Sequence, residues 1–161
     1  MNIFIVDKDP TIAAQQLCDK HVVKMILESA QMLCAAYPKG EAPYKRAFYN
    51  HPCTVWARES AANYEWLLTH ANEMCHEYTH RYGKAHKSSD AIQWCGDNSH
   101  HLNLSELGQT PFAQAMPDEF KNACAVTAYR AYYNAEKAYF AKWTRREQPE
   151  WFNYAWPATT P

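Results

Sequence analysis

The sequence predicts a compact all-α domain of three long helices joined by shorter ones. Apolar residues make up 47% of the 161 residues and aromatic residues 14%, whereas only 4 residues are glycine. Three long stretches repeat apolar residues with the 3.6-residue period of a helix. Because a chain of this length is typical of one domain, we expect a single helical domain over 1–161, with 148–161 as an aromatic, proline-rich tail packed on its surface.

The first helix is predicted from a capping signal. Residues 2–6 are expected to form a short strand or an extended segment. Asp9 before Pro10 is a typical N-cap followed by proline in the first turn. We expect the helix to run to about Ala36, with a break near Asp19, which could itself cap a second segment.

Two further long helices follow. The second is predicted over Pro52–Tyr82 and ends at Gly83, and the third over Ala123–Trp143. A short helix is expected between them, over His86–Cys95. The residues that share the apolar side of the second helix are Trp56, Ser60, Tyr64, Leu67, Leu68, Ala71, Met74, Cys75, Tyr78 and Tyr82.

One face of the first helix carries groups that can do chemistry. Its core side is predicted to hold Val22, Val23, Ile26, Leu27, Ala30, Leu33 and Cys34. The opposite side holds His21, Lys24 and Glu28, interleaved with Met25 and Met32, which indicates a covered cleft. A carboxylate beside an amine and an imidazole can stabilise a developing cation and move protons. The alternative is a solvated face with an ordinary i,i+4 ion pair between Lys24 and Glu28.

Several other classes of protein are disfavoured. No stretch has the length of a membrane span, and the start of the chain does not have the pattern of a signal peptide. The 6 cysteines form no CxxC pair, so we expect reduced thiols and a cytoplasmic protein. Cys75, His76 and His80 lie on different sides of their predicted helix, so no metal is expected. No nucleotide-binding or hydrolase motif occurs, and no cofactor is expected.

The distribution of charge gives only weak evidence about binding partners. The net charge is −1, but from Lys121 onward six basic residues face three acidic ones, which leaves room for a local basic patch. Glu136 falls among the aromatic residues of the third predicted helix. We expect it to be a buried acid with a tyrosine or lysine partner rather than a catalytic group.

Two resemblances extend this reading. The segments CDKHVVKMILESAQML, NHPCTVWARES, EYTHRYGKAHKS and TPFAQAMPDEF together look like a group of phage-encoded proteins of unassigned function. More distantly, the order of short motifs resembles the phage pyrimidine-dimer DNA glycosylase family, endonuclease V. The residues that carry this likeness are Leu17, Asp19, His21 and Glu28, then Pro52, the stretch 77–83, Pro117, Glu119 and Phe120, and finally Pro149, Trp151 and Phe152.

This resemblance implies a compact all-α enzyme that extrudes a base and attacks the sugar C1′ atom. In that family the nucleophile is the N-terminal amine, and α-amines are more often neutral at physiological pH than lysine side chains are. Glu28 would then stabilise the oxocarbenium-like sugar and shuttle protons, and His21 would orient groups and contact phosphate. The expected catalytic residues are thus Glu28, His21, Met1 and Lys24.

The chain also departs from the family. It begins Met-Asn, from which removal of Met1 is not expected, so the attacking group could be the Met1 amine, Lys20, Lys24 or a water activated by Glu28. Leu27 stands where the family has arginine. The predicted DNA-binding residues are Lys20, Asn50, His51, Arg58, Lys121, Trp151 and Phe152.

Three functions remain open from the sequence. The first is a monomeric DNA glycosylase, with or without lyase activity, acting on a damaged or modified base in DNA. The second is a phage enzyme that modifies a base, a nucleotide or another N-glycoside, which the low net charge favours because duplex affinity depends on phosphate neutralisation. The third is a non-enzymatic phage protein that binds a host factor through the tail from Trp151 to Trp156.

Overall fold

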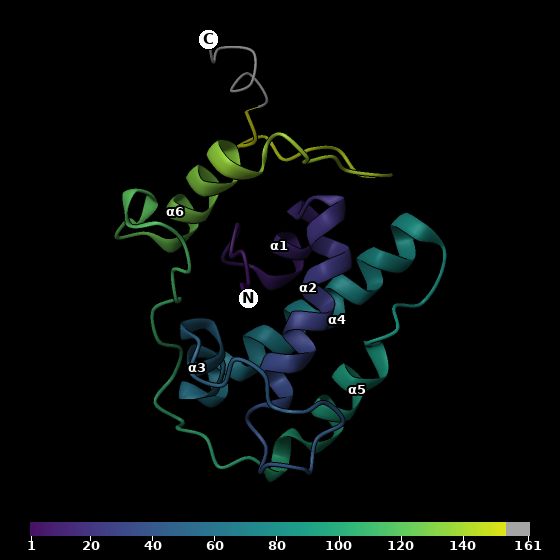
Figure 1. Cartoon of the computed structure of the whole chain (residues 1–161), viewed down its shortest axis with the longest axis vertical. Coiled ribbons are helices and arrows are strands. Elements are labelled where there is room, and N and C mark those ends of the chain that lie inside the picture. Colours follow the sequence, from purple (N-terminus) through teal and green to yellow (C-terminus); the bar gives the residue numbers. More distant parts are fainter. Residues whose placement is uncertain (154–161) are drawn as a thin grey trace.

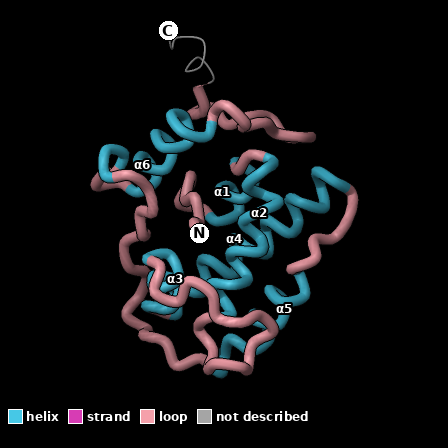
Figure 2. The backbone as a smooth tube through the Cα atoms, viewed as in Figure 1, coloured by secondary structure: helices cyan, strands magenta, loops and turns pink. Residues whose placement is uncertain are grey.

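The computed structural model describes residues 1–153, and within them the chain is all-helical, as predicted (Figures 1 and 2). The α-helices are α1 (Pro10–Gln16), α2 (Asp19–Cys34), α3 (Pro52–Glu59), α4 (Ala61–Tyr82), α5 (Ser89–Asn98) and α6 (Ala125–Tyr132). Two short 3₁₀ segments, η1 (Ser99–His101) and η2 (Asp118–Phe120), and one π-helical turn, η3 (Tyr133–Lys137), complete the elements. No helix in the described part is long and apolar enough to cross a membrane.

The first predicted helix is divided where the sequence indicated. The Asp9 side chain accepts hydrogen bonds from the backbone nitrogens of Thr11 and Ile12, and Pro10 lies in the first turn of α1. The chain is extended at Leu17, where ψ is 140°, and α2 begins two residues later at Asp19.

Of the two forms that the sequence allowed for residues 2–6, the structure has no strand. This segment is extended and buried, but it has no neighbouring strand, and Phe4 has a φ of 55°, which interrupts a strand conformation. Its polar groups are satisfied by side chains instead: the Asn2 Oδ1 atom accepts from the backbone nitrogens of Ile3 and Phe4 at 2.8 and 3.1 Å. The N-terminal segment therefore forms part of the core without forming a sheet.

The second predicted helix is two helices rather than one. Ser60 leaves the helical region, with φ −153° and ψ 159°, and its hydroxyl accepts from the Asn63 nitrogen at 3.0 Å as the N-cap of α4. The apolar period continues across this break, so the pattern alone does not reveal it. Gly83 ends α4 as predicted, with φ 71° and a hydrogen bond from its nitrogen to the Thr79 oxygen.

The third predicted helix is shorter than expected. Regular α-helix ends at Tyr132, and the π turn over η3 follows, which changes the direction of every later side chain. As a result Glu136 is exposed, and its prediction as a buried acid is wrong. Tyr133 is fully buried instead, and its hydroxyl accepts from the Cys18 nitrogen at 3.1 Å.

Helix α4 is the centre of the packing, because α1, α2, α3 and α5 all lie against it. The N-terminal segment lies between α2 and the α6 end of the chain (Figure 1). It covers the side of α2 that carries Met25 and Met32, which are both buried. Val23 and Leu27 were predicted in the core but are 42% and 43% exposed, because α2 turns that side to solvent.

Candidate active site

Three charged side chains form one row along α2. Lys20, Lys24 and Glu28 are four residues apart, so each lies about 6 Å along the helix axis from the next. Glu28 is buried at 9% exposure, whereas Lys24 reaches solvent and places its Nζ atom 4.0 Å from Glu28 Oε2. The row thus runs from exposed lysines into a buried carboxylate.

The start of the chain meets that carboxylate. The α-nitrogen of Met1 lies 3.4 Å from Glu28 Oε1, and the backbone nitrogen of Asn2 donates to the same oxygen at 3.0 Å. An amine and a carboxylate held together in this way can exchange a proton.

Four contacts fix the position of this amine. Asn2 Nδ2 donates to the Ala115 oxygen at 2.7 Å, and Asn2 Oδ1 caps the next two backbone nitrogens. The Met1 side chain is 1% exposed and its sulfur accepts from the Thr54 hydroxyl at 3.1 Å. Chain ends are usually mobile unless tied down in this manner, so the terminal amine here has a defined place.

His21 lies behind the site rather than on its surface. Its ring stacks on Phe4, with 4.1 Å between ring centroids, and its Nδ1 atom lies 2.5 Å from the Tyr133 hydroxyl. Burial, followed by the charges of Lys137, Lys24 and Lys20, lowers the pKa of His21 to about 3. The imidazole is therefore neutral at physiological pH and supports Phe4, two residues from Asn2.

The N-terminal end of α3 forms one edge of the site. His51 is the N-cap, and its Nδ1 atom accepts from the Cys53 nitrogen at 3.1 Å. Burial lowers the pKa of His51, the charge of the chain's N-terminus lowers it further, and the Glu28 charge partly opposes both effects. Asn50 is exposed next to it, and Arg58 donates to the Tyr49 oxygen at 2.8 Å.

The remaining predicted DNA-binding residues make contacts elsewhere. Lys121 pairs with Asp118 at 2.8 Å, close to η2. Trp151 donates from Nε1 to Gln16 Oε1 at 3.0 Å, and Phe152 is buried with its ring 4.7 Å from that of Trp143. Pro149 and Phe152 are buried, and the remainder of the tail, including Trp156, lies outside the described residues.

A buried ion network, which no sequence pattern indicated, lies beside the site. Arg81 is 2% exposed and contacts Asp19 at 3.0 Å and Glu77 at 2.7 Å. Arg146 binds the other Glu77 oxygen at 2.6 Å, and the Thr144 hydroxyl donates to Asp19 at 2.6 Å. Asp19 and the stretch 77–83, which carried the family likeness, therefore join α2, α4 and the C-terminal segment.

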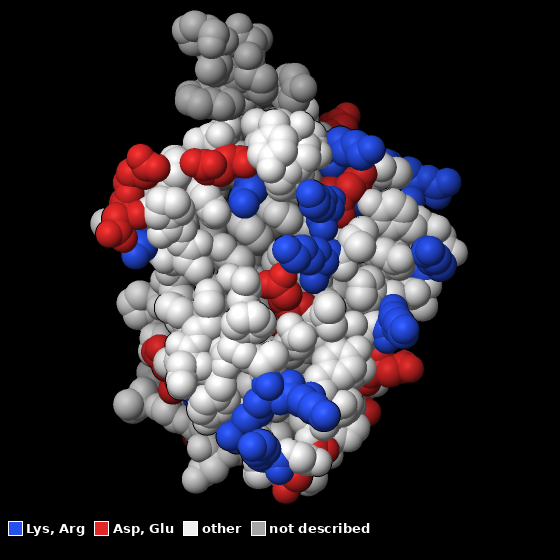
Figure 3. All heavy atoms as spheres, viewed as in Figure 1, with Lys and Arg blue, Asp and Glu red and all other residues white. Residues whose placement is uncertain are grey.

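A hollow of about 480 Å³ adjoins the lysine end of the row. It is lined by Asp19, Lys20, Val23, Lys24, Tyr82, Lys142 and Thr144. Lys142 was not predicted, because only folding brings it next to α2, where its backbone oxygen accepts from the Asp19 nitrogen at 2.8 Å. On the face shown in Figure 3, basic side chains lie above and below acidic atoms near the middle, and further ones lie along the right edge.

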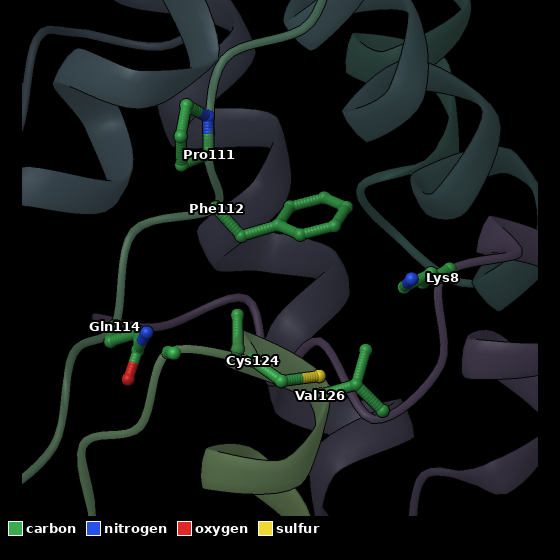
Figure 4. Close-up of a pocket in the computed structure, with 8 residues that line it drawn as sticks. Lys8, Pro111, Phe112, Gln114, Cys124 and Val126 are labelled. Carbon is green, nitrogen blue, oxygen red and sulfur yellow. The ribbon is translucent and has the colours of Figure 1, made fainter.

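A second hollow, of about 300 Å³, lies between Lys8, the segment around Phe112 and the start of α6 (Figure 4). Its lining includes Cys124 and Val126 but none of the predicted site residues. Among residues 1–153 no cluster of His, Cys, Asp and Glu could hold a metal ion. His76 pairs with Glu73 instead.

An all-helical scaffold that presents a fixed amine, a buried carboxylate and a row of lysines has the layout of a small enzyme acting on nucleic acid. The chain belongs to the pyrimidine dimer DNA glycosylase family, whose model matches residues 1–90. The match includes α1 to α4 and both partners of the amine–carboxylate contact. No curated protein and no solved structure matches the chain. The resemblance to this family is thereby confirmed over residues 1–90, and membership in the family implies DNA as the substrate.

Proposed function

We propose that this protein excises a damaged or modified pyrimidine from DNA through attack of the Met1 α-amine on the sugar C1′ atom. The observation that carries this proposal is the 3.4 Å separation between the Met1 nitrogen and Glu28 Oε1. A nucleophile beside a group that can take its proton is the arrangement that covalent catalysis requires. The amine is also fixed, so little ordering is needed on the way to the transition state.

The proposed reaction has three stages: attack with release of the base, opening of the sugar ring, and elimination of the 3′ phosphate. The lone pair of the Met1 nitrogen forms a bond to C1′, and the bond from C1′ to the base breaks, so its electron pair leaves with the base, which then takes up a proton. Glu28 accepts a proton from the attacking amine and passes it to the ring oxygen O4′ as the C1′–O4′ bond opens. The product is an imine between Met1 and C1′, from which loss of a C2′ proton expels the 3′ phosphate.

The contacts of Lys24 favour Met1 as the attacking group. The Lys24 side chain is 65% exposed and reaches only the outer oxygen of Glu28, at 4.0 Å. An exposed ion pair of this length is weak and does not hold the lysine nitrogen in one place. Lys24 and Lys20 are better suited to binding phosphates beside the lesion, together with Lys142 across the hollow.

We assign His21 a positioning role. Its neutral ring supports Phe4, which continues the segment that carries the amine. Asn50, His51 and Arg58, at and near the start of α3, would contact another part of the DNA backbone. Lys121, Trp151 and Phe152 have packing partners within the chain and are not needed for this proposal.

The test is to incubate the protein with ultraviolet-irradiated duplex and with abasic duplex, each with and without borohydride. We expect a reduced covalent adduct, and peptide mass analysis should place it on Met1. Glu28→Gln should lower turnover by about a hundredfold or more while the protein keeps its helical content. Lys24→Ala is the matched control and should keep the adduct. An adduct on a lysine would overturn the role of Met1, and absence of cleavage and adduct on every damaged duplex would overturn the glycosylase proposal.

A further inference from the structure

Phe48 is an exposed aromatic residue in a strained conformation. Its side chain is 66% exposed, and its φ is 51°. This is the left-handed region, which residues other than glycine, asparagine and aspartate seldom adopt. Packing does not explain either feature, because most of the ring touches no other part of the protein. Strain of this kind persists where surrounding contacts enforce it and is often connected with function.

The neighbours of Phe48 hold this conformation. The backbone nitrogen of His51 donates to the Phe48 oxygen at 3.0 Å. On the other side, Arg58 donates to the Tyr49 oxygen at 2.8 Å, and Arg46 donates to the Tyr37 oxygen at 3.0 Å. The loop is therefore fixed at both ends, with the phenyl ring directed away from its own core.

Two guanidinium groups lie against Tyr49, the residue that follows Phe48. The guanidinium carbon of Arg58 lies 3.7 Å from the centroid of the Tyr49 ring, and that of Arg46 lies 4.4 Å from it. Lys45 adds a third positive charge next to them, and it is exposed. Guanidinium groups are well suited to binding phosphates near an inserted ring.

The chain connects Phe48 to the part of α3 that contacts Met1. His51 follows it by three residues, which limits their Cα atoms to a separation of about 10 Å. Thr54, one turn into α3, contacts the Met1 sulfur at 3.1 Å. The loop that carries Phe48 thus leads directly into the helix turn against which Met1 packs.

We propose that Phe48 is a wedge that enters the base stack of the DNA beside the lesion and keeps the extruded nucleotide out of the duplex. This inference rests on the proposed function, because attack on C1′ within a duplex requires that the stack at the lesion first be opened. Extrusion leaves a gap, and an aromatic ring that fills the gap recovers part of the lost stacking. A ring already exposed and oriented needs no rearrangement to do so, and Arg46 and Arg58 would neutralise the phosphates of the kinked strand.

The test measures unstacking separately from chemistry. The probe is a duplex with a tetrahydrofuran abasic analogue, which cannot form an imine, next to the fluorescent base 2-aminopurine. We expect the wild-type full chain to raise the 2-aminopurine fluorescence on binding. Phe48→Ala should abolish most of that rise and weaken binding about tenfold, and Phe48→Trp should restore both. Leu107→Ala, at a loop residue that is 98% exposed, is the matched control for loss of a surface apolar side chain.

Each outcome decides a different point. If the wild type binds the probe and Phe48→Ala raises the 2-aminopurine fluorescence as much as the wild type does, the wedge proposal is wrong. The glycosylase proposal would then still stand. Cleavage of irradiated duplex that is reduced in Phe48→Ala but equal to wild type on single-stranded DNA would support the wedge, since a single strand needs no opening. If the wild type does not bind the probe duplex, the wedge and the proposed function on which it rests both fall. Thermal melting of each variant reports whether its fold is retained.

Discussion

Glu28 Oε1 accepts a hydrogen bond from the Asn2 backbone nitrogen at 3.0 Å and lies 3.4 Å from the Met1 nitrogen. One oxygen therefore contacts two successive nitrogens of the main chain. This bond fixes the register of the first residues relative to α2, so the place of the amine depends on the chain starting at that residue.

A single glycine added before Met1 tests this dependence. The extension moves the amine by up to about 3.5 Å, one residue step, and replaces it at Glu28 by an amide nitrogen, which is not nucleophilic. We expect loss of the borohydride-trapped adduct and at least a hundredfold lower cleavage of abasic duplex. Glycine added after Pro161 serves as the control. Unchanged adduct formation with the N-terminal extension, in a protein that melts like the wild type, would contradict the role of the Met1 amine.

The lysines around the 480 Å³ hollow should set the salt dependence of DNA binding. Lys20 and Lys142 come from α2 and from the C-terminal segment, and both line the hollow. If each neutralises one phosphate, the double variant Lys20→Ala with Lys142→Ala lowers the slope of log affinity against log salt by about 1.8. Fluorescence anisotropy on a damaged duplex at several salt concentrations measures it. The control Lys39→Ala with Lys84→Ala removes two exposed charges outside the hollow, and an equal slope for both pairs would argue against the assignment.

The sequence predicted the parts of the fold that depend on local signals. The Asp9 cap, the break before Asp19 and the stop at Gly83 all rest on neighbouring residues, and all three occur in the structure. The break at Ser60 was missed because Ser60, which caps α4, also falls on the apolar side of one continuous predicted helix. The early end of the third helix was missed because a π turn leaves the sequence pattern unchanged.

The site was partly predictable for the same reason. His21, Lys24 and Glu28 share a helix, so their common side follows from spacing, although only contact with Phe4 and Tyr133 makes His21 a buried neutral ring. The covered side of α2 was read from Met25 and Met32, but nothing in the period indicated that the cover is the start of the chain itself. The Arg81 network joins residues that lie far apart in sequence, so no local sequence pattern predicts it.

The buried ion network should be essential for stability. Arg81 contacts both Asp19 and Glu77 and donates to the Gln15 oxygen at 2.9 Å, all in a setting without water contact for its guanidinium. Arg81→Ala leaves two buried carboxylates short of a partner, which costs about 3–5 kcal/mol. Urea denaturation followed by circular dichroism measures the loss. Lys84→Ala, just beyond the same helix, should change the unfolding free energy by less than about 0.5 kcal/mol. A small effect of Arg81→Ala would show that the carboxylates find other partners.

Stability should fall in mild acid because of His21. The unfolded imidazole binds a proton below its ordinary pKa of 6.5, whereas the folded ring stays neutral down to about 3. Between these values the unfolded state binds more protons, so the free energy of unfolding decreases as the pH falls, by at most about 1.4 kcal/mol per pH unit. Glu77 adds to the loss only at lower pH: burial raises its pKa, but the hydrogen bonds and charges of Arg146 and Arg81 outweigh this and lower it below 4.5. His21→Gln should therefore flatten the profile between pH 6.5 and 5, measured by urea denaturation at each pH, and a profile as steep as that of the wild type would contradict this assignment.

The strain at Phe48 should separate stability from activity. Glycine adopts a φ of 51° without the steric cost that a Cβ atom brings, which is about 1 kcal/mol in the left-handed region. The phenyl ring is mostly exposed, so little packing is lost on its removal, although the flexible unfolded chain offsets part of the gain. We expect Phe48→Gly to melt slightly above the wild type and Phe48→Ala to melt at or below it, because alanine keeps the strain and loses the few contacts of the ring. Both variants should cleave irradiated duplex more slowly than the wild type. Differential scanning calorimetry measures the melting temperature of both variants, and a cleavage assay on the same preparations measures their activity. A Phe48→Gly protein less stable than the wild type would show that the phenyl ring stabilises the loop.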